Sequence, residues 1–289
     1  MTCKPASQIP SSLKKVMPDE LKPTGFSSAT PTTGLNKEKV APKGPTIPSV
    51  VQYLGNSVDF GAITDQKNNE WDCVDRALWG IAYARQKFPG IAVGMAEGIA
   101  SVGSINNGNH AVMILWDKDF NYLYHDPLQP GKPVTFNSIE RIFAFPFGSD
   151  GQIDTVDPLR KLMLPRIKDN NYVHWDTEYQ IYPKTTDDRR GIEDYLSYAV
   201  YDPKCIDLNS INLDYWKAAD AALWSYMHVR RHYKGAAIGL AFGVPDDPNK
   251  SKVVNLIWTL EANKIKPVFW DPNPKFKMEV GFTPKRVFF

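Results

Sequence analysis

The chain has 289 residues, of which 43% are hydrophobic and 23% are charged, so it can bury the core of one large domain or of two average ones. Its formal net charge of +2 lacks the basic excess of a nucleic-acid binder, and we expect no nucleic-acid partner. No apolar run approaches the length that spans a membrane, and the first residues lack a signal-peptide apolar region, so we expect neither a membrane partner nor secretion.

The N-terminal residues 1–48 are rich in Pro, Ser, Thr, Lys and Gly and show neither helical nor strand periodicity. This composition predicts an extended or disordered arm. Two interpretations stay open: a mobile tail, or an arm that becomes ordered on a partner or a neighbouring subunit.

From residue 49 to 148 the sequence is typical of a globular unit. Apolar residues at helical spacing predict a helix that begins at Cys73 and is ended by Pro89-Gly90. "GIAVGMAEG" predicts a buried strand, "HAVMILW" and "NYLYHDP" predict two strands around the turn "DKDF", and "IERIFAFPF" predicts another. We interpret "GMAEGIASVGSINNGNH" as a flexible loop in which Asn106 to Asn109 shape a substrate entrance.

The segment from Ala218 to Gly243 resembles the segment from Cys73 to Gly98 without a gap, at a constant offset of 145 residues. The same offset relates rare residue types throughout both segments and beyond them, namely Trp71 and Trp216, Trp79 and Trp224, Arg85 and Arg230, Gly90 and Gly235, and Asp126-Pro127 and Asp271-Pro272. We infer a tandem duplication of one α+β unit. The second copy covers residues 191–289, and a polar connector with local structure covers residues 149–190.

Cys73 lies in the first turn of the predicted helix, with Asp72 as its expected N-cap. A helix N-terminus favours a thiolate and supplies backbone donors for an oxyanion, so Cys73 is a candidate nucleophile. The alternative is a packing residue, since free cysteines are commonly buried. Cys3, Cys73 and Cys205 are few, odd in number and far apart, which favours free thiols in a reducing compartment over disulfides or a metal site.

A histidine and an aspartate accompany Cys73 on the next predicted strands. If the hairpin turn centres on Lys118, His110 and Asp126 stand directly opposite each other on one face, where the carboxylate would orient the imidazole. His125 points to the other face and is the poorer candidate.

The motifs "DCVDRA", "GIAVGMAEG" and "NHAVMILWDKDFNYLYHDP" resemble the transglutaminase-like cysteine hydrolases, a branch of the papain-like proteins. Asp72-Cys73-Val74-Asp75, His110-Ala111 and Asp126-Pro127 match the family pattern over roughly residues 70 to 128. The resemblance implies an α+β fold of a helix packed on an antiparallel sheet. It also implies Cys73 as nucleophile, His110 as general base and acid, and Asp126 as orienting carboxylate, with no cofactor and no metal. Members include transglutaminases, proteases, amidases and proteins without activity.

In the second copy the offset places Ala218 at the position of Cys73 and Asn255 at the position of His110, while Asp271 corresponds to Asp126. Alanine cannot attack a carbonyl, and asparagine cannot move a proton at neutral pH. We therefore interpret the second copy as a degenerate unit that retains the scaffold.

Two functions follow from these observations. The first is a thiol-dependent hydrolase or acyltransferase that acts on an amide of a protein or peptide substrate. The second is a non-catalytic assembly protein, such as a virion or large-complex subunit, whose N-terminal arm contacts neighbouring subunits. We expect a cytoplasmic or virion-associated location for either.

Overall fold

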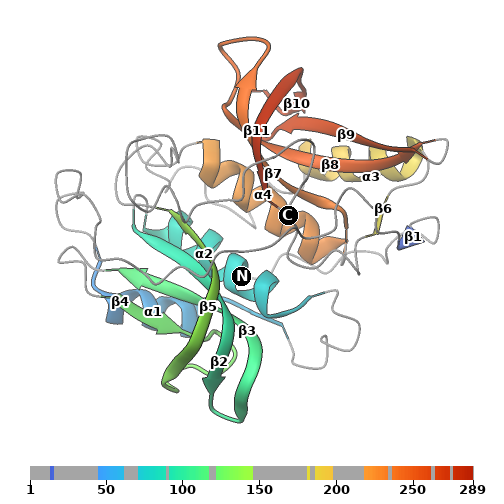
Figure 1. Ribbon diagram of the computed structural model, residues 1–289. Helices are drawn as coiled ribbons and strands as arrows, with labels where there is room; N and C mark the ends of the chain where they lie inside the picture. Colours follow the sequence, from blue (N-terminus) through green and yellow to red (C-terminus); the bar gives the residue numbers. More distant parts are fainter. Residues whose placement is uncertain are drawn as a thin grey trace.

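The protein is a mixed α+β structure of two antiparallel sheets with helices packed on them, seen in a computed structural model (Figure 1). The structure describes residues 14–15, 45–61, 71–88, 91–116, 122–145, 181–182, 186–197, 218–233, 236–261, 264–273 and 276–288. Most of the predicted arm and of the predicted connector lies outside these residues, as do Cys3 and Cys205.

The first unit is a four-stranded sheet with two helices. Its helices are α1 (Ile47–Ser57) and α2 (Cys73–Lys87). Its strands are β2 (Val93–Val102), β3 (Ile105–Trp116), β4 (Tyr122–His125) and β5 (Val134–Phe145), in the spatial order β4-β3-β2-β5. The predicted helix and the predicted strands are thus confirmed, whereas α1 was not expected.

The second unit repeats this arrangement and adds a short edge strand, β10 (Met278–Glu279), to its sheet. Its helices are α3 (Thr186–Ser197) and α4 (Ala218–His232). Its strands are β7 (Ile238–Pro245), β8 (Val253–Glu261), β9 (Lys264–Asp271), β10 (Met278–Glu279) and β11 (Phe282–Phe288), in the order β10-β9-β8-β7-β11. A separate two-stranded pair joins β1 (Lys14–Lys15) to β6 (Ile181–Tyr182).

The helices α2 and α4 both have 15 residues and begin at positions that differ by 145. The strand pairs β2–β5 and β7–β11 also correspond at this offset, since Met95 pairs with Phe143 and Leu240 pairs with Phe288. In both pairs the register shifts at the same place, after Glu97 in β2 and after Phe242 in β7. The repeat therefore extends to a bulge, which is a specific feature of a strand pair.

The helices α2 and α4 lie side by side between the two sheets (Figure 1). Four rings meet between them, namely Trp79 and Tyr83 of α2 with Trp224 and His228 of α4, with cross-helix centroid distances of 4.7 to 6.2 Å. Buried side chains of both units form a single hydrophobic cluster. One continuous core consequently holds the two units together.

Reciprocal ion pairs flank this aromatic contact. Arg85 binds Asp220, and Arg230 binds Asp75 through the same two guanidinium nitrogens. In each unit the arginine also donates to a backbone carbonyl, that of Ile91 or of Ala236, again at the offset of 145. The contact between the units thus has the pairwise reciprocity of a two-fold symmetric interface.

Candidate active site

The start of α2 is fixed by a capping box. Asp72 Oδ1 accepts hydrogen bonds from the N–H groups of Val74 and Asp75 at 2.8 and 3.0 Å, and Asp75 Oδ2 accepts from the Asp72 N–H at 3.4 Å. The expected N-cap role of Asp72 is therefore confirmed. This cap makes Cys73 the first residue of the helix, where the backbone N–H groups are not used by the helix itself.

The Cys73 thiol lies against the sheet rather than in solvent. The residue is half-buried, and its thiol has a hydrogen-bond interaction with the backbone of Ala111 on β3. Burial raises the pKa of the thiol far above its ordinary value, and the Asp72 carboxylate raises it further. The Ala111 backbone acts in the opposite direction, and the Glu97 carboxylate again raises the pKa. The prediction that the helix N-terminus would favour a thiolate is wrong here, because burial and two carboxylates raise the pKa of the thiol.

His110 and Asp126 form a buried pair. The imidazole Nε2 lies 3.0 Å from Asp126 Oδ2, and both side chains are at most 4% exposed. The other carboxylate oxygen, Oδ1, accepts a hydrogen bond of 2.8 Å from the Leu128 N–H. The carboxylate is thereby held by backbone while it orients the ring, as the sequence predicted for these two residues.

The register of the hairpin differs from the predicted one. Met113 pairs with His125, so facing positions have numbers that sum to 238 rather than 236. Asp126 follows the last residue of β4 and is a diagonal neighbour of His110, not its directly opposite partner. Because the register has moved by two residues, and side chains alternate with a period of two, the side chains of His110 and Asp126 remain on one face of the sheet and still meet.

The two faces of β3 have different neighbours. Ala111, Met113 and Leu115 belong to the core that contains α2, whereas Ile114 and Trp116 belong to a small cluster on the other face. Alternation along the strand places His110 on this second face. His125 is the partner of Met113 and lies on the α2 face, as expected, where burial lowers the pKa of its ring.

The structure thus brings His110 and Asp126 together and places Cys73 beside the next residue of the same strand. Within the described part of the chain, no hydrogen bond joins the Cys73 thiol to the His110 ring. β4 pairs with β3 only between Met113 and Trp116, which leaves the β3 edge at His110 and Ala111 outside that ladder. The thiol therefore lies beside Ala111 on the α2 face of β3, while the imidazole lies one residue away on the opposite face.

In the second unit, the carboxylate that corresponds to Asp126 receives its hydrogen bonds without a histidine. Asp271 Oδ2 accepts a hydrogen bond of 2.9 Å from the Ser251 N–H, and its Oδ1 accepts one of 3.0 Å from the Asn273 N–H. A backbone donor thus occupies the role that the imidazole has at Asp126. No thiol stands at the helix start, where the residue is Ala218.

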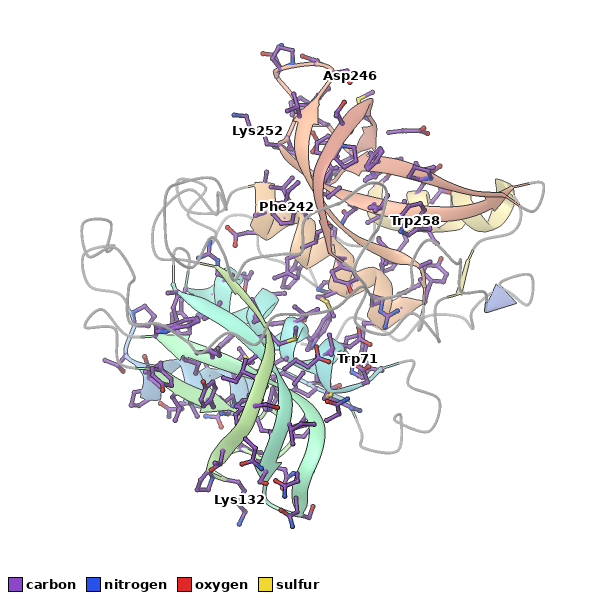
Figure 2. All side chains as sticks on the ribbon, in the orientation of Figure 1. Trp71, Lys132, Phe242, Asp246, Lys252 and Trp258 are labelled. Carbon is purple, nitrogen blue, oxygen red and sulfur yellow. The ribbon has the colours of Figure 1, made fainter. Side chains whose placement is uncertain are left out.

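The expectation that Asn255 occupies the position of His110 is wrong. Met113 pairs with Met95 and Asn255 pairs with Leu240, so the strands β3 and β8 correspond at an offset of 142, not 145. Asn255 is then the counterpart of Met113, and it faces α4, where its Nδ2 donates to the Ala222 carbonyl at 2.9 Å. At this offset His110 corresponds to Lys252, at the outer end of the second sheet (Figure 2).

The stretch interpreted as a flexible loop is a hairpin. β2 and β3 pair from Val93 and Leu115 to Val102 and Ile105, with a turn at residues 103–104. Gly103 has a φ of +56° and Asn107 one of +52°, conformations that glycine and asparagine adopt readily. Asn106 to Asn109 therefore belong to a paired strand, and the prediction of a loop there is wrong.

Glu97 was missed by the sequence analysis. It lies on β2 directly opposite Ala111 and affects the Cys73 thiol. A signal was present in the repeat, because the offset of 145 places Phe242 at this position of the second unit. A carboxylate where the related position is a core phenylalanine indicates a role other than packing.

No group of three His, Cys, Asp or Glu side chains among the described residues could hold a metal ion. None of the helices in the described ranges has both the length and the apolar character of a bilayer-spanning segment. The candidate site consists of Cys73 and Glu97 on the α2 face of the sheet and of the His110–Asp126 pair on the opposite face.

No family model, curated protein or solved structure matches this chain. The resemblance to the transglutaminase-like superfamily stays a prediction based on the three motifs.

Proposed function

We propose that the first unit is a thiol-dependent amide hydrolase or acyltransferase with Cys73, His110 and Asp126 as its triad. The observation that carries the proposal is the 3.0 Å hydrogen bond from His110 to Asp126, one residue away from the strand backbone that contacts the thiol. An imidazole oriented by a carboxylate is the general base of such reactions. The expected substrate is a protein or peptide, and the triad itself needs no cofactor.

The hydrogen bond of the ring assigns a role to each nitrogen. Nε2 is occupied by Asp126, so Nδ1 is left to exchange a proton with the thiol. Because the ring lies on the face opposite α2, this exchange requires the thiol and Nδ1 to meet at the β3 edge beside Ala111. In the proposed reaction the Cys73 sulfur attacks the amide carbonyl while its proton passes to Nδ1, and the imidazolium then protonates the leaving amine.

The capping box limits which donors can stabilise the oxyanion. The N–H groups of Val74 and Asp75 are engaged by Asp72, which leaves the Cys73 N–H at the start of α2. Because the pKa of the thiol is raised, the resting thiol is protonated. Proton transfer would then accompany attack on the carbonyl rather than precede it.

We further propose that the two units descend from a duplicated transglutaminase-like unit. The equal helix lengths, the shared strand order and the bulge at the same position support this origin. Ala218 and the backbone donor to Asp271 make the second unit a scaffold in this proposal.

An activated ester, p-nitrophenyl acetate, tests the proposal without knowledge of the natural substrate. The expected result is a burst of p-nitrophenolate and transfer of one acetyl group to Cys73, measured by peptide mass spectrometry. Cys73→Ala should abolish the burst, and His110→Ala and Asp126→Asn should each lower its rate at least about tenfold. Asp271→Asn is the matched control, a buried carboxylate of the second unit, and should leave the rate unchanged. A burst that persists in Cys73→Ala, or that responds equally to Asp271→Asn, contradicts the proposal.

The second candidate function is a non-catalytic assembly subunit. The raised pKa of the Cys73 thiol favours it, since a protonated thiol is a poor nucleophile. In that case Cys73→Ala leaves assembly intact, and thiol reagents label Cys73 no faster than Cys3. The predicted N-terminal arm would then contact neighbouring subunits, which cross-linking of arm lysines to a second chain would detect.

A further inference from the structure

We propose that Glu97 is a positioning residue that gives the Cys73 site a preference for substrates with a positively charged group beside the reactive carbonyl. This inference rests on the proposed thiol chemistry and adds the substrate class to it. Three observations support it: the register of Glu97, its counterpart in the second unit, and the charges around the thiol.

The register places Glu97 next to the thiol. Glu97 pairs with Ala111, whose backbone contacts Cys73. Val93 and Met95, four and two residues before Glu97 on β2, belong to the core that contains α2, so alternation directs the Glu97 side chain to the helix side of the sheet. One carboxylate oxygen of Glu97 is buried there.

The repeat shows what this position holds when no thiol is present. Phe242 immediately precedes the β7 bulge, as Glu97 precedes the β2 bulge, and Phe242 is 7% exposed in the core against α4 (Figure 2). The unit with alanine at the helix start has an apolar side chain here, and the unit with cysteine has a carboxylate. Because a half-buried carboxylate stands where the second unit packs a phenylalanine, and because this carboxylate acts on the Cys73 thiol, we assign Glu97 a role at the thiol rather than in packing.

Two carboxylates raise the pKa of the thiol. Asp72 lies at its own helix end, and Glu97 faces it from β2. Arg141 is the register partner of Glu97 on β5. A cationic substrate group between Glu97 and Cys73 would offset the negative potential and favour the thiolate at the moment of binding, whereas an anionic group would be repelled.

Two alkylating reagents of the same size and leaving group test the charge preference. Iodoacetamide is neutral and iodoacetate is anionic, and the rate at Cys73 is measured for each by peptide mass spectrometry between pH 7 and 9.5. In the unsubstituted protein, the iodoacetate-to-iodoacetamide ratio should be lower at Cys73 than for N-acetylcysteine amide. Glu97→Gln should raise the ratio and also raise the iodoacetamide rate, about threefold for each unit by which the thiol pKa falls, because the thiolate becomes more abundant but less nucleophilic.

Two further variants separate charge from packing. Glu97→Asp keeps the charge and should keep the low ratio, and Met95→Leu, on the same face of β2, changes packing without charge and should keep it too. Equal iodoacetate-to-iodoacetamide ratios in the unsubstituted protein and in Glu97→Gln overturn the inference. A ratio at Cys73 of the unsubstituted protein equal to that of N-acetylcysteine amide also overturns it, and this measurement does not depend on the folding of a variant. Acetyl transfer to Cys73 with no charge preference removes only the role of Glu97. A charge preference without acetyl transfer removes the proposed function and, with it, the substrate class.

Discussion

Arg85 on α2 holds the Asp220 carboxylate on α4 through two hydrogen bonds of 2.6 and 3.1 Å, and both side chains are about 1% exposed. Removal of one partner leaves the other charge buried without its counterion, which destabilises a fold strongly. We expect Arg85→Met to lower the free energy of unfolding by about 3–5 kcal/mol, measured by urea denaturation. The double variant Arg85→Met/Asp220→Leu should recover much of this loss. A single variant as stable as the unsubstituted protein would show that the pair does not hold the units together.

Asp72 influences Cys73 in two ways that substitution can separate. Asp72→Asn keeps an N-cap oxygen but removes a charge that raises the thiol pKa, so labelling of Cys73 by iodoacetamide should become faster with little loss of stability. Asp72→Ala removes the charge and the cap, and should additionally lower the free energy of unfolding by about 1 kcal/mol. Slower labelling in Asp72→Asn would contradict the assigned electrostatic effect.

His228 makes the stability of the protein depend on pH. Burial between α2 and α4 lowers the pKa of its ring from 6.5 to about 3, so the folded protein keeps it neutral where the unfolded chain binds a proton. Its contribution to stability is complete above pH 6.5 and is lost as the pH falls toward 3, by about 1.4 kcal/mol per pH unit. His228→Leu should reduce the slope of unfolding free energy between pH 6 and 4 by about one proton. His232, whose pKa burial lowers to about 4, adds a smaller effect of the same sign, because its side chain is more exposed. An unchanged slope in His228→Leu would show that other groups cause the acid sensitivity.

Gly243 allows β11 to approach β7 at the bulge. A Cβ at this position would lie 2.1 Å from the Thr283 carbonyl oxygen and 2.9 Å from the Pro284 Cα, and neither backbone atom can move alone. We expect Gly243→Ala to destabilise the protein by about 1–3 kcal/mol. Gly55 in α1 has open space around it, so Gly55→Ala is the control and should stabilise by up to about 1 kcal/mol. A harmless Gly243→Ala would mean that the bulge relaxes more readily than its contacts indicate.

The sequence predicted the elements around Cys73 well because local signals determine them. Asp72 and Pro89-Gly90 mark the ends of α2, and runs of apolar residues mark β2, β3 and β4. The pair of His110 with Asp126 was also predictable, because alternation depends only on whether two positions share a face.

Register and electrostatics were less predictable because they depend on neighbours distant in sequence. A difference of three residues between the β2–β3 and β7–β8 connections shifts β8 against the constant offset, so sequence alone aligned Asn255 with the wrong residue. The direction of the Cys73 pKa shift was missed for a similar reason, since the sequence reveals the helix start but not the depth of burial or the approach of Glu97.

Because α2 and α4 share a single core, substitutions in the second unit can disturb the site in the first. Trp224 and Leu223 lie far in sequence from the cysteine, yet they form one wall of the compartment on which its helix rests. The second unit is therefore required even though it lacks the reactive groups. Loss of α4 would expose the apolar face of α2 to water and remove the packing that holds Cys73 in place.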